Sequence, residues 1–184
     1  KYFGVKRYCR VGAMYDAVPH TRPLLITGSL GAVPQLRPVA NFKIRRSTYQ
    51  GPTTIMNLVS EGIERLQIDS MNFMVHLPQY LQLEEDYAGT SRMLEVLSSV
   101  YDVIPADQAT VRRGQRQYRE LSGAVERNAE LKTLIQQMEA YYDAQMDSDE
   151  SVSETSTPAP PLSPEIERFL SELGGTLDNP ETKD

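Results

Sequence analysis

Two histidines and an arginine stand at positions where an open α/β sheet commonly binds a ligand. His20 and Arg22 lie in "DAVPHTRPLLITG", residues 16–28, just before an apolar stretch. His76 lies near the end of another apolar stretch, "SMNFMVHLP". Ligands of open α/β sheets tend to bind beyond the carboxyl ends of strands. Both histidines could therefore face one crevice, and imidazole and guanidinium groups there would donate hydrogen bonds to a phosphate or carboxylate.

The segment "QGPT" offers a further component of such a site. Gly51 allows close backbone approach, and Thr53 carries a hydroxyl at the predicted start of a helix. Helix N-termini attract anions because their backbone N–H groups are unpaired and the helix dipole is positive there. The predicted anion site consists of His20, Arg22, Thr53 and His76.

The same residues also fit a purely structural interpretation, in which the loop is a rigid turn. Pro19 and Pro23 fix backbone angles near both ends of the loop. Arg22 can pair with an acid such as Asp16, and a histidine in an apolar strand is typically a hydrogen-bonded core residue. The sequence favours the rigid turn, while its residue types also permit an anion site.

Other chemistry finds little support in the sequence. Cys9 lies in a predicted strand without an evident base beside it, which is typical of a buried, inert thiol. Two histidines and one cysteine at distant positions give no metal-ligand spacing. The "GSLGAVP" segment lacks the Lys-Ser/Thr of a phosphate-binding loop, and no Gly-x-Ser-x-Gly elbow is present. We therefore predict no catalytic residue, no metal and no cofactor.

The elements that would position these residues alternate between strand and helix. Apolar runs and turn residues predict strands over 8–15, 23–28 and 70–78 and helices over 52–66 and 87–101. Gly28 is expected to end the second strand. This alternation implies an α/β domain, residues 1–104, with parallel neighbouring strands.

The remaining residues predict a helical extension and a tethered helix. A helical hairpin is expected over 105–143, with its break near Ser122-Gly123. An acidic, proline-bearing linker over 144–162 has the composition of a disordered segment. A short helix over 163–175 follows, with Ser163 as its N-cap, and then a disordered tail over 176–184.

The short helix carries a narrow apolar stripe, made of Ile166, Phe169, Leu170 and Leu173. A helix of this length is not stable alone in water. It must dock either on its own chain or on another chain, and in the second case these four residues would bind the partner.

Charge and hydropathy limit the possible partners. From Asp143 onward there are eleven acidic and two basic residues, so an acidic tail follows a weakly basic body. The basic cluster Arg112, Arg113, Arg116 and Arg119 has helical spacing and no aromatic stacking platform, so we predict a solvated helix face and no nucleic-acid partner. No apolar run approaches the roughly 18 residues that span a bilayer, so we predict no membrane partner. A single cysteine excludes an internal disulfide and fits the cytoplasm.

Three segments resemble a known family in their order and spacing: "VGAMYDAVPHTRPLLITG", "STYQGPTTIMNLVSEGIERLQI" and "VHLPQYL". Together they are similar to the bacterial branch of the proteasome assembly chaperone 2 family, over about residues 5–143. The resemblance implies a three-layer α/β/α domain with a mostly parallel sheet and a C-terminal helical extension. The family normally opens with a further strand–helix region, so we expect this chain, which starts at Lys1, to lack an N-terminal part.

The function implied by this resemblance is that of a non-enzymatic assembly chaperone or scaffold. It would be cytoplasmic, form a homo-oligomer and act through contacts with protein partners that the sequence does not name. The chain departs from the family in carrying "EEDYAGTS" where a Pro-Asn-Pro run is common. It also ends in Thr182-Lys183-Asp184 and not in a hydrophobic–Tyr–any tripeptide, so docking on a proteasome through the tail is not predicted. The alternative is a carboxylate–amine ligase-like enzyme with an anion site at the "VPHTRP" loop.

Overall fold

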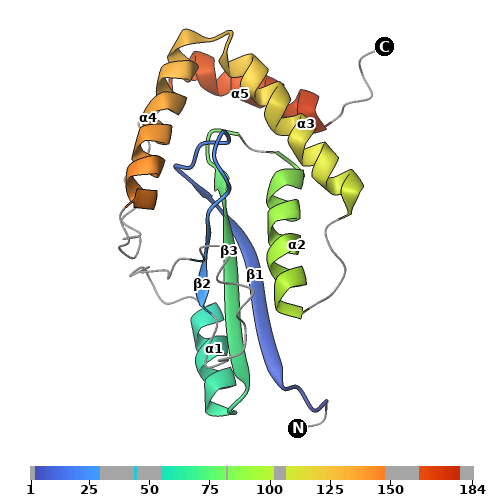
Figure 1. The fold of residues 1–184 in the computed structure, drawn as a ribbon. Helices are drawn as coiled ribbons and strands as arrows, with labels where there is room; N and C mark the ends of the chain where they lie inside the picture. Colours follow the sequence, from blue (N-terminus) through green and yellow to red (C-terminus); the bar gives the residue numbers. More distant parts are fainter. Residues whose placement is uncertain are drawn as a thin grey trace.

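In the part of the chain that the structure describes, a narrow, three-stranded sheet stands beneath an arch of helices (Figure 1). The computed structural model describes residues 3–29, 44, 55–81, 83–101, 107–147 and 162–178. The elements in chain order are β1 (Arg7–Asp16), β2 (Ile26–Ser29), α1 (Ile55–Arg65), β3 (Asp69–Pro78), α2 (Tyr87–Tyr101), α3 (Gln108–Val125), α4 (Ala129–Asp147) and α5 (Pro164–Asp178). The arch is built by α3, α4 and α5, and it covers the end of the sheet where β1 and β3 finish. None of the described helices is long and apolar enough to cross a membrane.

The α/β class and the C-terminal helical part are confirmed, and the sheet is mixed. The strand order is β1-β3-β2, with β1 parallel and β2 antiparallel to β3. The parallel pairing of β1 and β3 was expected, and the antiparallel β2 was not. Residues 17–25 between β1 and β2 are too few for a crossover, which takes a dozen or more residues, so the chain turns back.

Gly28 does not end the second strand as predicted but lies within β2, which continues to Ser29. Gly28 pairs with Phe73 of β3. A Cβ atom at position 28 would overlap the carbonyl oxygen of Asn72. Glycine is needed here because the two strands approach too closely for any side chain.

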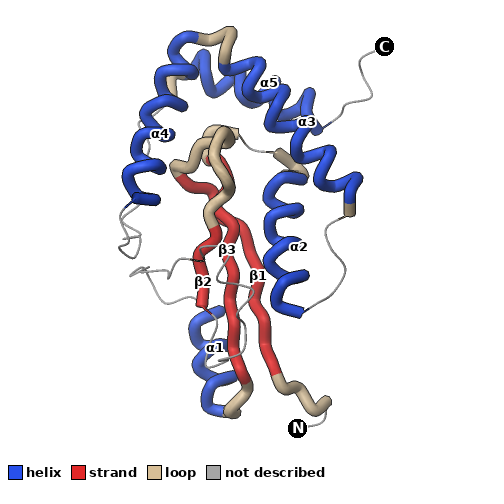
Figure 2. The backbone as a smooth tube through the Cα atoms, in the orientation of Figure 1, coloured by secondary structure: helices blue, strands red, loops and turns tan. Residues whose placement is uncertain are grey.

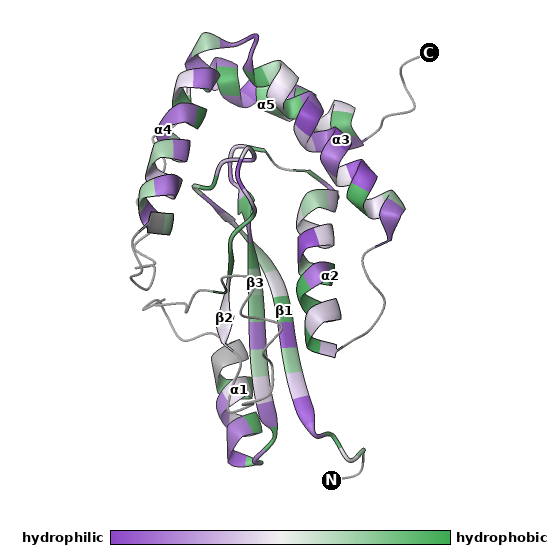
Figure 3. Cartoon of the chain, viewed as in Figure 1, coloured by the Kyte–Doolittle hydropathy of each residue, from purple (hydrophilic) through white to green (hydrophobic). Residues whose placement is uncertain are grey.

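Two large apolar cores and a small third one hold the described residues together, and the third joins Val18 and Leu25, between β1 and β2, to Tyr142 of α4. The first lies between the sheet and α2, where Met71 and Phe73 of β3 pack with Val96 of α2. The second lies inside the arch and joins α3, α4, α5 and the segment after β3. Its buried members are Tyr80, Leu81, Leu83, Leu121, Val125, Leu131, Ile135, Met138, Ile166, Leu170 and Leu177. The arch helices alternate between apolar and polar residues in Figure 3, as helices with one buried face require.

The helical hairpin breaks later than the sequence predicts. The helix α3 passes through Ser122-Gly123 and ends at Val125, because the flanking Leu121 and Ala124 are buried in the core. The break is set by Asn128, whose side-chain oxygen accepts bonds from the backbone N–H groups of Glu130 and Leu131, both at 3.1 Å. This is an N-cap, which satisfies two of the four unpaired donors at the start of α4.

The ends of α4 and α5 also lie later in the chain than the sequence predicts. The helix α4 runs to Asp147, so the first four residues assigned to the linker are helical, while residues 148–161 lie outside the described residues. The helix α5 passes its predicted stop at Gly174 and ends at Asp178. Leu177 is only 5% exposed, and its burial offsets the roughly 1 kcal/mol that each glycine costs within a helix. Residues 176–178 of the predicted tail are therefore helical, and 179–184 lie outside the described residues.

Candidate functional site

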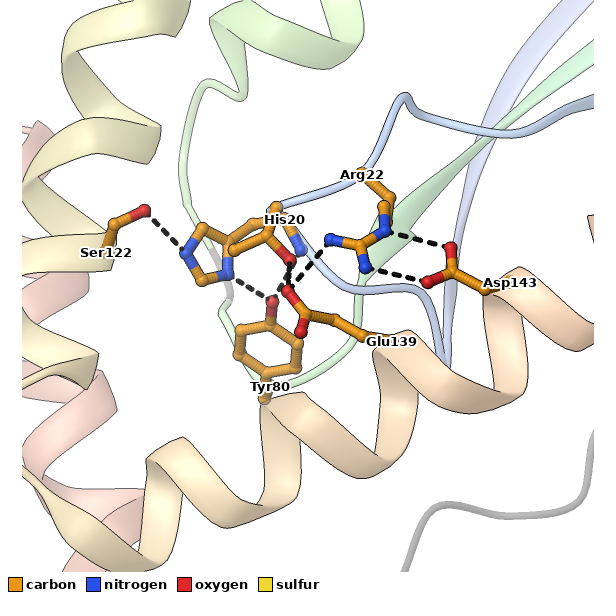
Figure 4. Close-up of polar contacts among 7 residues, drawn as sticks. His20, Arg22, Tyr80, Ser122, Glu139 and Asp143 are labelled. Atoms are coloured by element: carbon orange, nitrogen blue, oxygen red, sulfur yellow. Dashed lines mark hydrogen bonds and ion pairs between the residues drawn. The ribbon is translucent and has the colours of Figure 1, made fainter.

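The "VPHTRP" loop, residues 18–23, lies beneath the arch at the end of the sheet (Figure 2). A backbone bond of 3.3 Å from Arg22 N–H to the Pro19 carbonyl closes a tight turn. Val18 is buried, and so is His20, which is only 5% exposed. The loop is thus held between the sheet and the helical arm, and its side chains reach α3 and α4 (Figure 4).

The hydrogen bonds of His20 determine its tautomer. The Ser122 hydroxyl donates its proton to the Tyr118 carbonyl at 2.8 Å, so it can only accept from Nε2 of His20, at 3.0 Å. Nε2 therefore carries the proton, and Nδ1 accepts from the Tyr80 hydroxyl at 2.6 Å. The backbone N–H of His20 donates to the same Tyr80 oxygen at 2.8 Å. Both ring nitrogens of the neutral imidazole are satisfied by the protein itself.

The surroundings of His20 keep its ring uncharged. Burial lowers its pKa to about 4, although the nearby Glu139 carboxylate acts in the opposite direction. The rings of Tyr80 and Tyr118 lie edge-on to the imidazole, each with centroids 5.9 Å away. Burial likewise raises the pKa of both tyrosines, so neither carries charge near neutral pH. A neutral, fully bonded imidazole has no proton to offer an anion.

Arg22 is occupied by two carboxylates of α4. Its Nε and Nη2 donate to the two oxygens of Asp143 at 2.9 and 2.7 Å, which is the bidentate fork typical of arginine and carboxylate. Nη1 donates to Glu139 at 3.1 Å, and the Thr21 hydroxyl donates to the same Glu139 oxygen. The Arg22 hydrogen bond lowers the pKa of Asp143. Two carboxylates around one guanidinium leave a local charge of −1, which repels anions.

Replacing Arg22 by lysine should loosen this contact without removing its charge. Lysine is a point charge and cannot form the two parallel bonds to Asp143. Arg22→Lys should lower the melting temperature and speed hydrogen exchange around Asp143. The difference from wild type should shrink at high salt, because the pair is partly exposed and screened. A melting temperature equal to that of wild type at low salt would show that the bidentate geometry contributes nothing to stability.

His76 lies in a separate polar network that joins the three strands. Asp16 of β1 accepts the Nδ1 proton of His76 at 2.7 Å, and Nε2 is 2.8 Å from the Thr27 hydroxyl of β2. Burial raises the pKa of Asp16, but the bonds from His76 and from the backbone N–H of Ala17 outweigh it, so the net pKa is lowered. The order hydroxyl–imidazole–carboxylate is that of a hydrolase triad. Thr27 is only 1% exposed, so a substrate carbonyl has no path to its oxygen, and the network ties the strands together.

Thr27→Val tests the structural role of this network. Valine keeps the shape but removes the hydroxyl, so a buried nitrogen of His76 loses its partner. We expect a loss of about 1 to 2 kcal/mol in the free energy of unfolding. The measurement is urea denaturation, with Thr133→Val as a control at an exposed hydroxyl that bonds to the Ala129 carbonyl of its own helix. Equal effects for the two variants would contradict the role of Thr27.

Of the four residues of the predicted anion site, the structure describes three, and the side chains of these three share no hydrogen-bond partner. His20 and Arg22 share a loop, but their polar partners differ. His76 bonds to neither of them, and Thr53 lies outside the described residues. Within the described part of the chain, no group of three or more His, Cys, Asp or Glu residues could hold a metal ion.

The residues whose side chains hydrogen-bond to the loop were missed from the sequence: Tyr80, Ser122, Glu139, Tyr142 and Asp143. They lie 60 to 121 residues away from their partners in the loop. One sequence feature points to the acids, since Glu139 and Asp143 are four apart and share one face of a helix. Their pairing with Arg22 depends on how the arm folds back, which that spacing does not reveal.

The helix predicted to bind a partner lies on its own chain. Ile166 and Leu170 are 3% and 4% exposed in the core of the arch, and Phe169 and Leu173 pack partly buried against it. This is one of the two arrangements that the sequence left open. Binding of another chain by these residues stays a prediction.

Fold and site together define an α/β protein whose helical arm is fastened to the sheet by a polar loop. A family model described as the PAC2 family matches residues 1–120, and the chain belongs to this family. No curated protein matches the chain.

Solved structures share this fold. The chain is similar to a protein of unknown function from Corynebacterium glutamicum, with 20% identity, a TM-score of 0.71 and coverage of 81% of this chain and 54% of that one. A Mycobacterium tuberculosis protein of unknown function has 23% identity and a TM-score of 0.69, with coverage of 94% and 55%. A proteasome-assembly chaperone homologue from Mycobacterium tuberculosis has 22% identity and a TM-score of 0.60, with coverage of 73% and 56%. The chain spans about half the length of these proteins.

Proposed function

We propose that this chain is a non-enzymatic, assembly-chaperone-like or scaffold protein of the PAC2 family that acts through protein–protein contacts. The observation that carries the proposal is the state of the "VPHTRP" loop. The imidazole of His20 and the guanidinium of Arg22 bond to the chain's own side chains and not to a vacant site. The loop thus serves to fasten the arm.

Two further observations support this proposal. Thr27, the hydroxyl of the triad-like network, is buried. A solved structure with this fold is described as a proteasome-assembly chaperone homologue. We further propose that the protein forms a homo-oligomer and that it is cytoplasmic, the latter in line with its single cysteine.

Native mass spectrometry of the protein, purified gently from its own cells, tests the proposal. We expect stoichiometric complexes of several copies, or of this protein with another, and no retained small anion. A monomer without a protein partner would contradict it. A stoichiometric anion that is lost in Arg22→Ala would instead favour the ligase-like enzyme with a site at the loop.

A further inference from the structure

The helix α5 fills an apolar groove from which a second copy of the chain could displace it. We propose that this groove takes α5 from a second copy of the chain when two copies associate, so that the copies exchange α5. The inference rests on the proposed function in protein contacts and names the surface involved.

Elements other than α5 line the groove. The segment after β3 forms its floor, and α3 and α4 form its walls, as the core of the arch shows. Its lining residues are Tyr80, Leu81, Leu121, Val125, Leu131 and Ile135, all of them 5% exposed or less. These residues come from three elements that share one apolar core.

The bound helix uses one face only. Ile166, Leu170 and Leu177 are buried at positions i, i+4 and i+11, with the buried Gly174 between the last two. The opposite side is exposed and charged, with Glu165 as an example. This is the arrangement of an amphipathic helix laid in a groove, a common mode of recognition between chains.

Few polar contacts tie α5 to its own chain. Among the described residues, its bond to the body is that from the backbone N–H of Glu84 to Asp178 Oδ2, at 3.0 Å. The other carboxylate oxygen, Asp178 Oδ1, is buried without a partner in the described residues. The contact is therefore mainly apolar and identical whichever copy supplies the helix.

The tether reaches far enough for either arrangement. Residues 148–163 separate α4 from α5, and sixteen residues can extend to at most about 55 Å. The 19 residues of α4 span about 28 Å, so the sixteen residues are long enough to cover the length of α4 with some extension left over. Exchange of an element between identical copies is a low-cost route to dimers, because each copy regains the contact that it gives up.

Photo-crosslinking of the full chain tests the exchange. A photoreactive phenylalanine analogue at position 169, which packs against the groove, is introduced into isotopically light copies. These are mixed with heavy copies that lack the analogue. We expect crosslinks from light α5 to heavy groove peptides, increasing with protein concentration. Crosslinks confined to light chains at every concentration would overturn the exchange.

Light scattering of two matched variants measures self-association independently of the crosslinks. Ile166→Asp/Leu170→Asp disables the buried face and should weaken self-association by more than about tenfold, or 1.4 kcal/mol. Glu165→Gln/Glu172→Gln changes only the exposed face and should leave it unchanged. Stoichiometric complexes whose crosslinks stay within one chain would refute the exchange and leave the proposed function standing. A monomer with no partner would refute both.

Discussion

Gly114→Ala lowers the free energy of unfolding by about 2 to 3 kcal/mol, even though alanine is the better helix former. Gly114 lies on α3 where it meets the first turn of α2. A Cβ there would lie 2.6 Å from the backbone nitrogen of Ala88, 2.8 Å from its Cα and 2.9 Å from the carbonyl carbon of Tyr87. These are backbone atoms that cannot rotate away, so α3 must shift and the packing of the arm against α2 is lost.

Gly123→Ala is the matched control on the same helix. A Cβ at Gly123 has no neighbour within 4 Å, so only the gain in helix propensity remains, up to about 1 kcal/mol in favour of folding. Urea denaturation of both variants, with the slope compared as well as the midpoint, gives the two values. Equal effects at the two positions would show that α2 and α3 do not approach so closely.

Acidification from pH 7 to pH 4 removes roughly 3 kcal/mol of stability through His20 alone. Burial lowers the pKa of His20 to about 4 in the folded protein, while the unfolded chain keeps a value near 6.5. The unfolded state therefore binds the proton first. The stability is fully present above about pH 6.5 and is lost as the pH falls toward 4. Protonation would also place a hydrogen on Nδ1, where the Tyr80 hydroxyl now donates.

Other groups near the arm modify this acid sensitivity in known directions. Burial raises the pKa of Asp86, which accepts a hydrogen bond from the Tyr118 hydroxyl at 2.9 Å. Protonation of Asp86 therefore favours the folded state and opposes the loss of stability. The lowered pKa of Asp16 adds a further loss, but only as the pH falls below about 4. The steepest change between pH 6.5 and 4 should therefore belong to His20.

His20→Gln separates this contribution from the rest. Glutamine is polar and does not titrate, so stability should fall less steeply from pH 6.5 to 4, from a lower starting value at pH 7. The measurement is the urea midpoint across that range, with the imidazole resonance of His20 followed by NMR in the wild type. A His20 that titrates near pH 6.5, or an unchanged slope in the variant, would contradict the account.

Local features of the fold could be predicted from the sequence. The alternation of apolar runs located β1 and β3, and their parallel pairing followed from the order of elements. The prolines around His20 indicated a rigid turn. In each case the determining interactions lie within a few residues, where periodicity and backbone restriction act.

Features set by distant contacts could not be predicted in this way. The glycine at 114 is required by α2, and the continuation of α5 past Gly174 follows from the burial of Leu177 inside the arch. Likewise, the acids that pair with Arg22 lie 117 and 121 residues further along the chain. Spacing along the sequence places such residues on a helix face, but only the folded arm determines which loop that face meets.

Hydrogen exchange of the full chain tests most directly whether the "VPHTRP" loop fastens the arm. Amide protection in wild type is compared with that in His20→Ala/Arg22→Ala, together with the binding of inorganic phosphate to both. The account predicts that protection falls around Ser122 of α3 and Glu139 of α4 while β3 stays protected, with no phosphate bound by either protein. Unchanged protection in both helices, with phosphate bound by wild type and not by the variant, would contradict it and identify the loop as an anion site.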